Sequence, residues 1–206
     1  MNQLGVGLYD NFNIRPLELY GWNGDKPFVS RVIREYRPQV VIEVGTWKGL
    51  SARTMGFEMK SYTNAGKIYC VDTWLGNYEF WYSQDKEFDL KLINGYPSVY
   101  YNFLSNVKHW NLDSIIVPVP MPSNIAYKLF KEKLKLTAKV VYVDGSHETE
   151  DVYKDLSSYI NLVEPGGIIF GDDFNKESVK AAVFRYSYDT NRVYKVAEDN
   201  FWYFEV

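Results

Sequence analysis

The sequence predicts an α/β fold with three layers, in which a mostly parallel sheet of seven strands lies between two layers of helices. Short runs of β-branched apolar residues, such as 40–44, have the composition of strands buried on both faces of a parallel sheet. Segments with apolar residues at helical spacing alternate with these runs. At the C-terminal end, two expected strands, 192–196 and 201–205, flank a Glu-Asp-Asn turn, and this pattern predicts an antiparallel hairpin.

The predicted elements follow one another without an internal repeat or a linker. Residues 1–26, rich in Gly and Asn, are expected to be an irregular N-terminal cap segment with at most a short helix. The expected helices cover 27–36, 51–60, 98–109, 123–136, 148–162 and 177–186. The expected strands before the hairpin cover 39–44, 66–72, 114–119, 139–144 and 168–173. Ser123 or Asn124 is expected to cap the fourth helix, and Glu164-Pro-Gly-Gly is expected to form a turn.

Size and composition favour a single globular domain over residues 1–206. The chain is 46% hydrophobic and 24% charged, and 23 Lys and Arg against 26 Asp and Glu give a net charge of −3. This balance gives no basic surface for nucleic acid. No apolar run is long enough to cross a membrane, so no membrane partner is expected. The single cysteine, Cys70, cannot form an internal disulfide, which fits a reducing, cytoplasmic setting.

The first predicted strand ends in a glycine turn that leads into a helix. Gly45 and Gly49 permit a tight turn and a close approach of a ligand to the backbone, and Ser51 begins the helix. Strand, glycine turn and helix form the unit that places backbone N–H groups against a nucleotide. Glu43, two residues before the first glycine, needs hydrogen-bond donors or a cation because burial of a carboxylate is costly. A buried strand with a tight turn and a paired Glu is the simpler alternative.

The second predicted strand also ends in an acid, Asp72, at the distance from Glu43 that one β-α-β unit requires. Such an acid can accept both hydroxyls of a ribose, and Trp74 could then lie against an adenine. A helix cap or turn residue is the alternative role of Asp72. The following residues 77–97 interleave aromatic and charged side chains and do not fit the repeating unit. They are a candidate acceptor-site lid or, equally, a contact in a homo-oligomer.

The fourth and fifth predicted strands end in a second group of acids. Asp144 is the last residue of the fourth strand, His147 lies three residues later, and Asp172 and Asp173 end the fifth strand. The carboxyl ends of parallel strands share one edge of a sheet, where three converging carboxylates would favour a cation such as Mg²⁺, with Mn²⁺ or Ca²⁺ as substitutes. An imidazole there could act as a base near neutral pH. A solvated turn for the two acids and a helix-start role for the histidine are the alternatives.

Glu-x-Gly-x-x-x-Gly on the first strand resembles the motif of the class I S-adenosylmethionine-dependent methyltransferases, which have a Rossmann-like fold. Asp-Gly-Ser-His, a helix, and then Glu-Pro-Gly-Gly-Ile-Ile-Phe-Gly-Asp-Asp are similar to the Mg²⁺-dependent sugar O-methyltransferases. That group includes the macrocin and mycinamicin enzymes, rhamnosyl O-methyltransferase and the cephalosporin hydroxylase-like proteins. The resemblance extends over residues 27–185, and the N-terminal region is shorter than in the macrolide enzymes.

The resemblance implies a role for each of these positions. S-adenosylmethionine would be bound by the two turns and by the acid after the fourth strand, namely Glu43, Gly45, Thr46, Trp47, Gly49, Ser51, Asp72, Thr73, Trp74 and Asp144. Asp144, Asp172 and Asp173 would bind Mg²⁺. His147 would be the general base, with Asp144 as the second catalytic residue, and the acceptor would be a sugar hydroxyl, for example of rhamnose in a glycan or a small molecule.

Two other functions stay open at this point. The same site could methylate a catechol or another small vicinal diol. The chain could instead be a non-catalytic nucleotide- or sugar-binding module with the same fold. An NAD-dependent oxidoreductase is disfavoured because the Gly-x-Gly-x-x-Gly pattern of dinucleotide-binding turns is missing.

Overall fold

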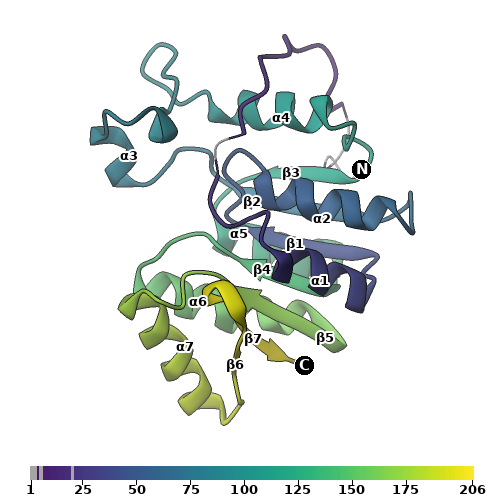
Figure 1. Cartoon of the computed structure of the whole chain (residues 1–206), viewed down its shortest axis with the longest axis vertical. Helices are drawn as coiled ribbons and strands as arrows, with labels where there is room; N and C mark the ends of the chain where they lie inside the picture. The colour runs from purple at the N-terminus through teal and green to yellow at the C-terminus, as the bar shows by residue number, and fades with distance from the viewer. Residues whose placement is uncertain (1–3, 5–6, 20) are drawn as a thin grey trace.

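The computed structural model describes residues 4, 7–19 and 21–206, and these form one sheet flanked by helices (Figure 1). The seven strands lie in the order β3-β2-β1-β4-β5-β7-β6. The first five are parallel, and β7 runs antiparallel to both β5 and β6. The predicted fold class is therefore confirmed, including the hairpin at the C-terminal end.

The strands occupy the predicted places with small shifts at their ends. Their bounds are β1 Val40–Val44, β2 Lys67–Asp72, β3 Ile116–Pro120, β4 Ala138–Val143, β5 Val163–Gly171, β6 Lys195–Val196 and β7 Trp202–Glu205. The turn predicted at Glu164-Pro-Gly-Gly is wrong, because these residues belong to β5. Val163 pairs with Ala138, and the register then shifts before Ile168 pairs with Val140, so the Pro-Gly-Gly run forms an irregularity within the strand.

The helices also follow the predicted pattern. Their bounds are α1 Pro27–Tyr36, α2 Leu50–Lys60, α3 Tyr78–Tyr82, α4 Val99–His109, α5 Ser123–Lys128, α6 Thr149–Tyr159 and α7 Glu177–Thr190. A π-helical segment, Leu129–Leu134, extends α5, and a 3₁₀ turn, Ile160–Leu162, extends α6. The predicted cap of α5 is wrong, since Pro122 holds the cap position and Ser123 is the first helical residue.

Two apolar cores, one on each face of the sheet, define the three layers. Helices α1, α2 and α4 pack on one face against strand residues such as Val41, Ile68 and Tyr142. Helices α5, α6 and α7 pack on the other face against residues such as Ile42 and Val141. Neighbouring residues of a strand alternate between the two cores, as expected for a sheet buried on both faces.

The described N-terminal residues 7–19 and 21–26, called the strap below, form neither helix nor strand and pass over α4 toward the start of α2 (Figure 1). Arg15 and Glu18 hydrogen-bond to α4, and Gly24 lies against the backbone of Ser51, where a Cβ atom would approach its nitrogen to 2.5 Å. The strap therefore packs beside the glycine turn. The predicted cap residues 1–3, 5–6 and 20 lie outside the described part.

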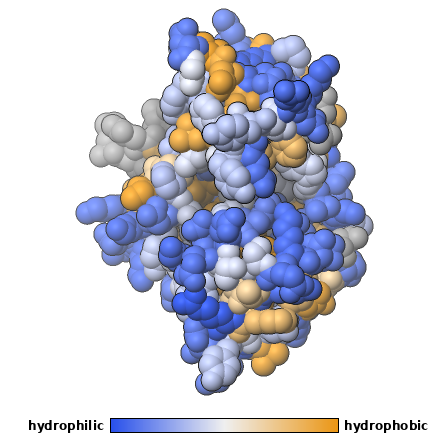
Figure 2. All heavy atoms as spheres, turned by 90° about the vertical axis from the view of Figure 1, so that its left-hand side faces the viewer, coloured by the Kyte–Doolittle hydropathy of each residue, from blue (hydrophilic) through white to orange (hydrophobic). Residues whose placement is uncertain are grey.

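The insertion 77–97 contains α3, a 3₁₀ turn and one isolated bridge between Ile93 and Tyr96. Figure 2 views the side of the molecule that carries α3, and it shows a mostly hydrophilic face with hydrophobic groups at its upper end. Tyr78, Trp81 and Tyr82 of α3 are exposed. Within the described part of the chain, no helix has the length and apolar character needed to cross a membrane.

Candidate active site

The strand register brings the predicted functional residues to one edge of the sheet. Val44 of β1 pairs with Val71 of β2 and with Val143 of β4, and Val143 pairs with Gly171 of β5. The four strands therefore end at the same level. The residues that follow, from the glycine turn and the acids after β2, β4 and β5, lie beside one another as predicted.

Glu43 is fully buried, and its side chain is hydrogen-bonded to residues of the glycine turn. Its carboxylate accepts hydrogen bonds from the hydroxyls of Thr46 (2.7 Å) and Ser51 and from the thiol of Cys70 (3.2 Å). Burial raises the pKa of Glu43 to about 7, although these three donors oppose the rise. The side chains of Thr46 and Ser51 are thus turned toward Glu43, so any contact of these two residues with a ligand is made by their backbone.

The carboxylate of Asp72 is held against the glycine turn. Its Oδ2 accepts from the backbone N–H groups of Thr46 (3.0 Å) and Trp47 (2.9 Å), and its Oδ1 accepts from the N–H of Trp74 (2.7 Å). A carboxylate has about four acceptor positions. One acceptor position on Oδ1 therefore remains for a ligand such as a ribose hydroxyl.

The position of Trp74 corrects the prediction that its ring faces an adenine. Its side chain is only 1% exposed and packs against Tyr100 and Phe103 of α4. Its indole Nε1 donates to the carbonyl of Trp47 at 2.7 Å. Trp74 thus belongs to the core and braces the turn, whereas the neighbouring Thr73 is exposed.

Packing within the protein explains why both positions of the turn are glycine. Gly45 has a φ of +83°, and a Cβ atom there would lie 2.2 Å from the carbonyl oxygen of Asp144. Gly49 has a φ of +90°, and its Cβ would meet the ring of Phe103 at 3.0 Å. The turn therefore needs glycine to fit against β4 and α4, whether or not a ligand approaches it.

Trp47 is the residue of the turn that is oriented for a ligand. Its φ of +48° is in the left-handed region, which a residue with a large side chain rarely adopts and which often marks a functional site. Its ring packs edge-on against Phe80 of the insertion, at 4.9 Å between centroids. Its indole Nε1 is buried and has no hydrogen-bond partner among the described residues. A buried donor without an acceptor is costly, so this N–H group is a candidate contact for a bound molecule.

The second group brings together three of its four predicted members. Atoms of Asp144, His147 and Asp173 that could bind a metal all lie within 4.8 Å of one another. His147 Nε2 is 2.7 Å from Asp173 Oδ2, and the histidine side chain is 43% exposed. Asp173 has a φ of +59°, which turns its side chain away from that of Asp172.

Asp172 is the member that does not join, and this corrects the predicted metal ligands. Its side chain is 5% exposed, its Oδ1 accepts from the N–H of Asp173 at 2.6 Å, and Asn23 of the strap also donates to it. The set of ligand atoms that converges is Asp144, Asp173 and His147. Asp172 is not one of these ligands, but its negative charge raises the pKa of Asp144.

The electrostatics of the acids follow from burial and mutual repulsion. Burial and the nearby Asp172 carboxyl hold the pKa of Asp144 well above its usual value. Burial also raises the pKa of Asp172. Burial has the same effect on Asp173, but hydrogen bonds from His147 and Lys176 outweigh it and lower the pKa of that carboxyl. A cation placed between Asp144 and Asp173 would favour the ionised form of Asp144 and so lower its pKa.

Sequence reasoning missed two partners of these acids. The buried hydroxyl of Tyr142 donates to Asp144 Oδ2 at 2.8 Å, and Lys176 Nζ lies 2.9 Å from Asp173 Oδ2. Their spacing gave a signal, because residues two apart on a strand share a face and residues three apart at a helix start lie close together. His109 has no place in this group, since its ring contacts the carbonyl of Arg15.

Comparison with known proteins identifies one sequence family and a shared fold. A family model described as a methyltransferase domain matches residues 42–174. An O-methyltransferase from Bacillus cereus in complex with SAH has a TM-score of 0.64 at 12% identity, with 94% of this chain and 84% of that chain covered. TomG from Streptomyces achromogenes, an O-methyltransferase involved in tomaymycin synthesis solved in complex with SAM, has a TM-score of 0.63 at 11% identity, with 98% and 87% covered.

The calicheamicin methyltransferase CalS11 has a TM-score of 0.59 at 14% identity, with 86% of this chain and 76% of that chain covered. At these identities the structural likenesses establish the fold alone. No curated protein sequence matches the chain.

Proposed function

The chain belongs to the methyltransferase-domain family, and on this premise we propose that it transfers the methyl group of S-adenosylmethionine to a hydroxyl oxygen of a sugar, with His147 as general base and a divalent cation at the site. The observation that carries this proposal is the convergence of Asp144, His147 and Asp173 within 4.8 Å, at the sheet edge that also holds the glycine turn. A base beside two carboxylates suits the activation of a hydroxyl group.

The cofactor would lie along the two turns. The open acceptor position on Asp72 would take one ribose hydroxyl, and the unpartnered indole N–H of Trp47 would donate to an oxygen or nitrogen of the cofactor. Glu43 would act indirectly, because its hydrogen bonds to Thr46 and Ser51 fix the shape of the turn. S-adenosylmethionine bound to TomG and SAH bound to the Bacillus cereus enzyme support this choice of cofactor.

The donor set fits a divalent cation. Asp144 and Asp173 would hold it through carboxylate oxygens, which suit Mg²⁺, Mn²⁺ or Ca²⁺. When bound, the cation would supply positive charge that lowers the pKa of a coordinated hydroxyl. Asp172, as the nearby buried carboxyl, would add negative charge behind the ligands.

His147 would remove the proton from the acceptor hydroxyl. Its Nε2–H donates to Asp173, which leaves Nδ1 as the proton acceptor and stabilises the imidazolium that forms. The acceptor oxygen then forms a bond to the methyl carbon as the bond from that carbon to sulfur breaks, and S-adenosylhomocysteine leaves. Alignment of the two reactants supplies much of the rate, and the insertion 77–97 would close over the acceptor.

The proposal is tested in two steps. Calorimetric titration with S-adenosylmethionine and S-adenosylhomocysteine, and with NAD as control, should give saturable binding of the first two alone. Methyl transfer to a panel of sugars and catechols is then measured with Mg²⁺, with Mn²⁺ and with EDTA. A sugar preference and loss of turnover in EDTA are expected, whereas transfer to catechols alone would reject the sugar acceptor.

Replacement of His147 distinguishes a role as general base from a purely structural role of this residue. His147→Ala should lower turnover by about 10² to 10⁴ while the affinity for S-adenosylhomocysteine is unchanged. The matched control is His109→Gln, which changes the other histidine on the far side of the glycine turn and should leave turnover near that of the original protein. Full turnover in His147→Ala, or loss of cofactor affinity, would contradict the assigned role.

A further inference from the structure

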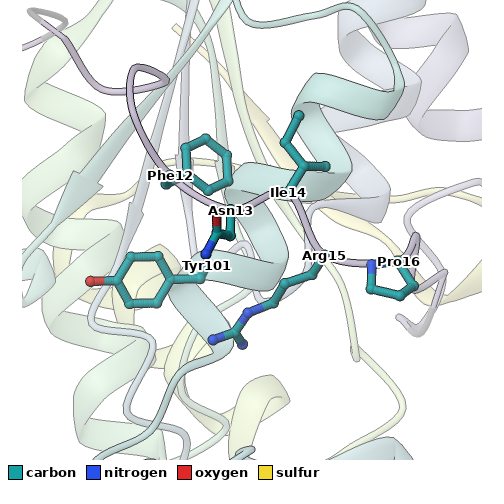
Figure 3. A pocket seen from close by; sticks show the side chains of 6 residues that line it. All are labelled: Phe12, Asn13, Ile14, Arg15, Pro16 and Tyr101. Atoms are coloured by element: carbon teal, nitrogen blue, oxygen red, sulfur yellow. The ribbon is translucent and has the colours of Figure 1, made fainter.

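A pocket lies between the strap and α4, away from the acids at the sheet edge. It has a volume of about 500 Å³ and opens to solvent between strap residues and the first turn of α4 (Figure 3). Its lining consists of Phe12, Asn13, Ile14, Arg15, Pro16 and Tyr101. The volume is sufficient for a molecule of the size of a sugar or a small aromatic acid.

The guanidinium of Arg15 is fixed in this pocket by neutral groups only. Its Nη1 donates to the carbonyl of Ser98 (3.0 Å), to the hydroxyl of the same residue (2.8 Å) and to Oδ1 of Asn102 (2.5 Å). Among the described residues, no carboxylate lies within ion-pair distance of Arg15, and its Nε and Nη2 have no hydrogen-bond partner. The side of the guanidinium that carries Nε–H and Nη2–H is therefore free to bind a ligand.

The nearby carboxylate does not neutralise the guanidinium of Arg15. Glu18, the carboxylate of the strap that follows Arg15, is already bound by Lys48 (3.0 Å) and Lys91 (2.9 Å). Ser98, whose carbonyl and hydroxyl fix Arg15, caps the N-terminal end of the 11-residue helix α4. That end of a helix carries partial positive charge, so its field adds to that of Arg15.

The rest of the pocket is lined by aromatic and apolar side chains and by the amide of Asn13. The guanidinium carbon of Arg15 lies over the ring of Tyr101, 5.4 Å from its centroid, and Tyr101 is 47% exposed. Phe12 and Ile14 also line the pocket, and Ile14 is 54% exposed. A pocket with a fixed guanidinium fork beside an exposed aromatic ring combines the two elements that bind an oxyanion and the ring that bears it.

We infer that this pocket binds an organic oxyanion, a carboxylate or phosphate carried on a ring, through the Nε and Nη2 donors of Arg15 and the exposed part of the Tyr101 ring. The Nη1 hydrogen bonds hold the strap to α4 and at the same time fix the direction of the fork. The inference concerns a site separate from the methyl-transfer centre and does not depend on the proposed reaction.

Binding of three related sugars to the full chain tests the inference. Calorimetry or saturation-transfer NMR at low salt compares glucose 1-phosphate, glucuronate and neutral glucose, so that phosphate and carboxylate are distinguished. Arg15→Lys keeps the positive charge and removes the fork, and Tyr101→Ala removes the ring while the Nη1 contacts of Arg15 stay. The matched control is Arg37→Gln, because Arg37 also lies over a tyrosine ring, Tyr62, at 4.7 Å.

Saturable binding of at least one anionic sugar is expected, with glucose weaker by about tenfold or more. Arg15→Lys should weaken binding of the anion by about tenfold, Tyr101→Ala by a smaller factor, and Arg37→Gln should have no effect. A purely structural role of Arg15 would be revealed by absent binding of both anions, or by binding that neither Arg15→Lys nor Tyr101→Ala changes. Either of these results would overturn the inference.

Discussion

Replacement of the buried acid below the glycine turn gives the sharpest physical test of the structure. Glu43 is 0% exposed, and its partners are two hydroxyls and a thiol, with no cation among them. Neutral donors only partly replace the water that the carboxylate loses on folding. Burial accordingly raises the pKa of Glu43 from its usual 4.5 to about 7.

The sign and size of the effect follow from proton linkage. Because the folded pKa is above the unfolded one, the folded state binds the proton more tightly, and the stability from Glu43 is complete below pH 4.5 and is lost as the pH rises through about 7. The difference between 4.5 and about 7 corresponds to about 3 kcal/mol in all, most of which is lost between about pH 5 and pH 8. Glu43→Gln has no ionised form and should lack this loss.

Urea unfolding between pH 5 and pH 8, followed by tryptophan fluorescence, measures the difference. Other groups titrate in both proteins, so the informative quantity is the difference between the free energies of unfolding of the original protein and of Glu43→Gln. This difference should change by about 2 to 3 kcal/mol over the range in favour of the variant at high pH. Glu177→Gln, which changes an 87% exposed side chain, is the control and should run parallel to the original protein. Parallel curves for Glu43→Gln would refute the reasoning.

Two further predictions concern the turn and the strap. Gly45→Ala should destabilise the fold by more than about 3 kcal/mol in urea unfolding, because its Cβ would lie 2.2 Å from a backbone oxygen at a φ of +83°. Gly95→Ala, at a φ of +80° with nothing within 4 Å, should cost only about 1 kcal/mol, and equal losses would contradict the packing explanation. Glu18→Gln should lower the free energy of unfolding by about 3 kcal/mol and expose the strap to limited proteolysis, because it removes the carboxylate that binds both Lys48, whose side chain is 1% exposed, and Lys91. Arg34→Gln, which breaks a surface ion pair, should cost less than about 1 kcal/mol and leave proteolysis unchanged.

Much of the site could be located from the sequence, because parallel strands end at one edge of a sheet. Apolar runs marked the strands, and the acids that follow them, Asp72, Asp144 and Asp173, do reach that edge. The expectation of a methyltransferase enzyme is likewise confirmed, by the family match over residues 42–174. The motif carried this information because its spacing is a local property of one strand, one turn and one helix.

The direction of individual side chains could not be obtained in this way. Trp74 was expected at an adenine but is buried against α4, and Asp172 was expected on a metal but lies behind its neighbour. Both errors arise at residues just beyond a strand end. There the alternation of a strand no longer fixes the side chain: Trp74 adopts a left-handed φ of +53°, and Asp172 is held by the N–H of Asp173 and by Asn23 of the strap.

The sequence by itself determined the order and kind of the elements, since hydrophobic period and glycine position act over a few residues. Only the tertiary structure decided which groups face one another. Glu18 meets Lys48, Arg15 meets Ser98 and His147 meets Asp173 through segments that are far apart along the chain or bent by a turn. Such contacts depend on how the strap and the strand ends pack together, and this packing is set by the whole core and by no single segment.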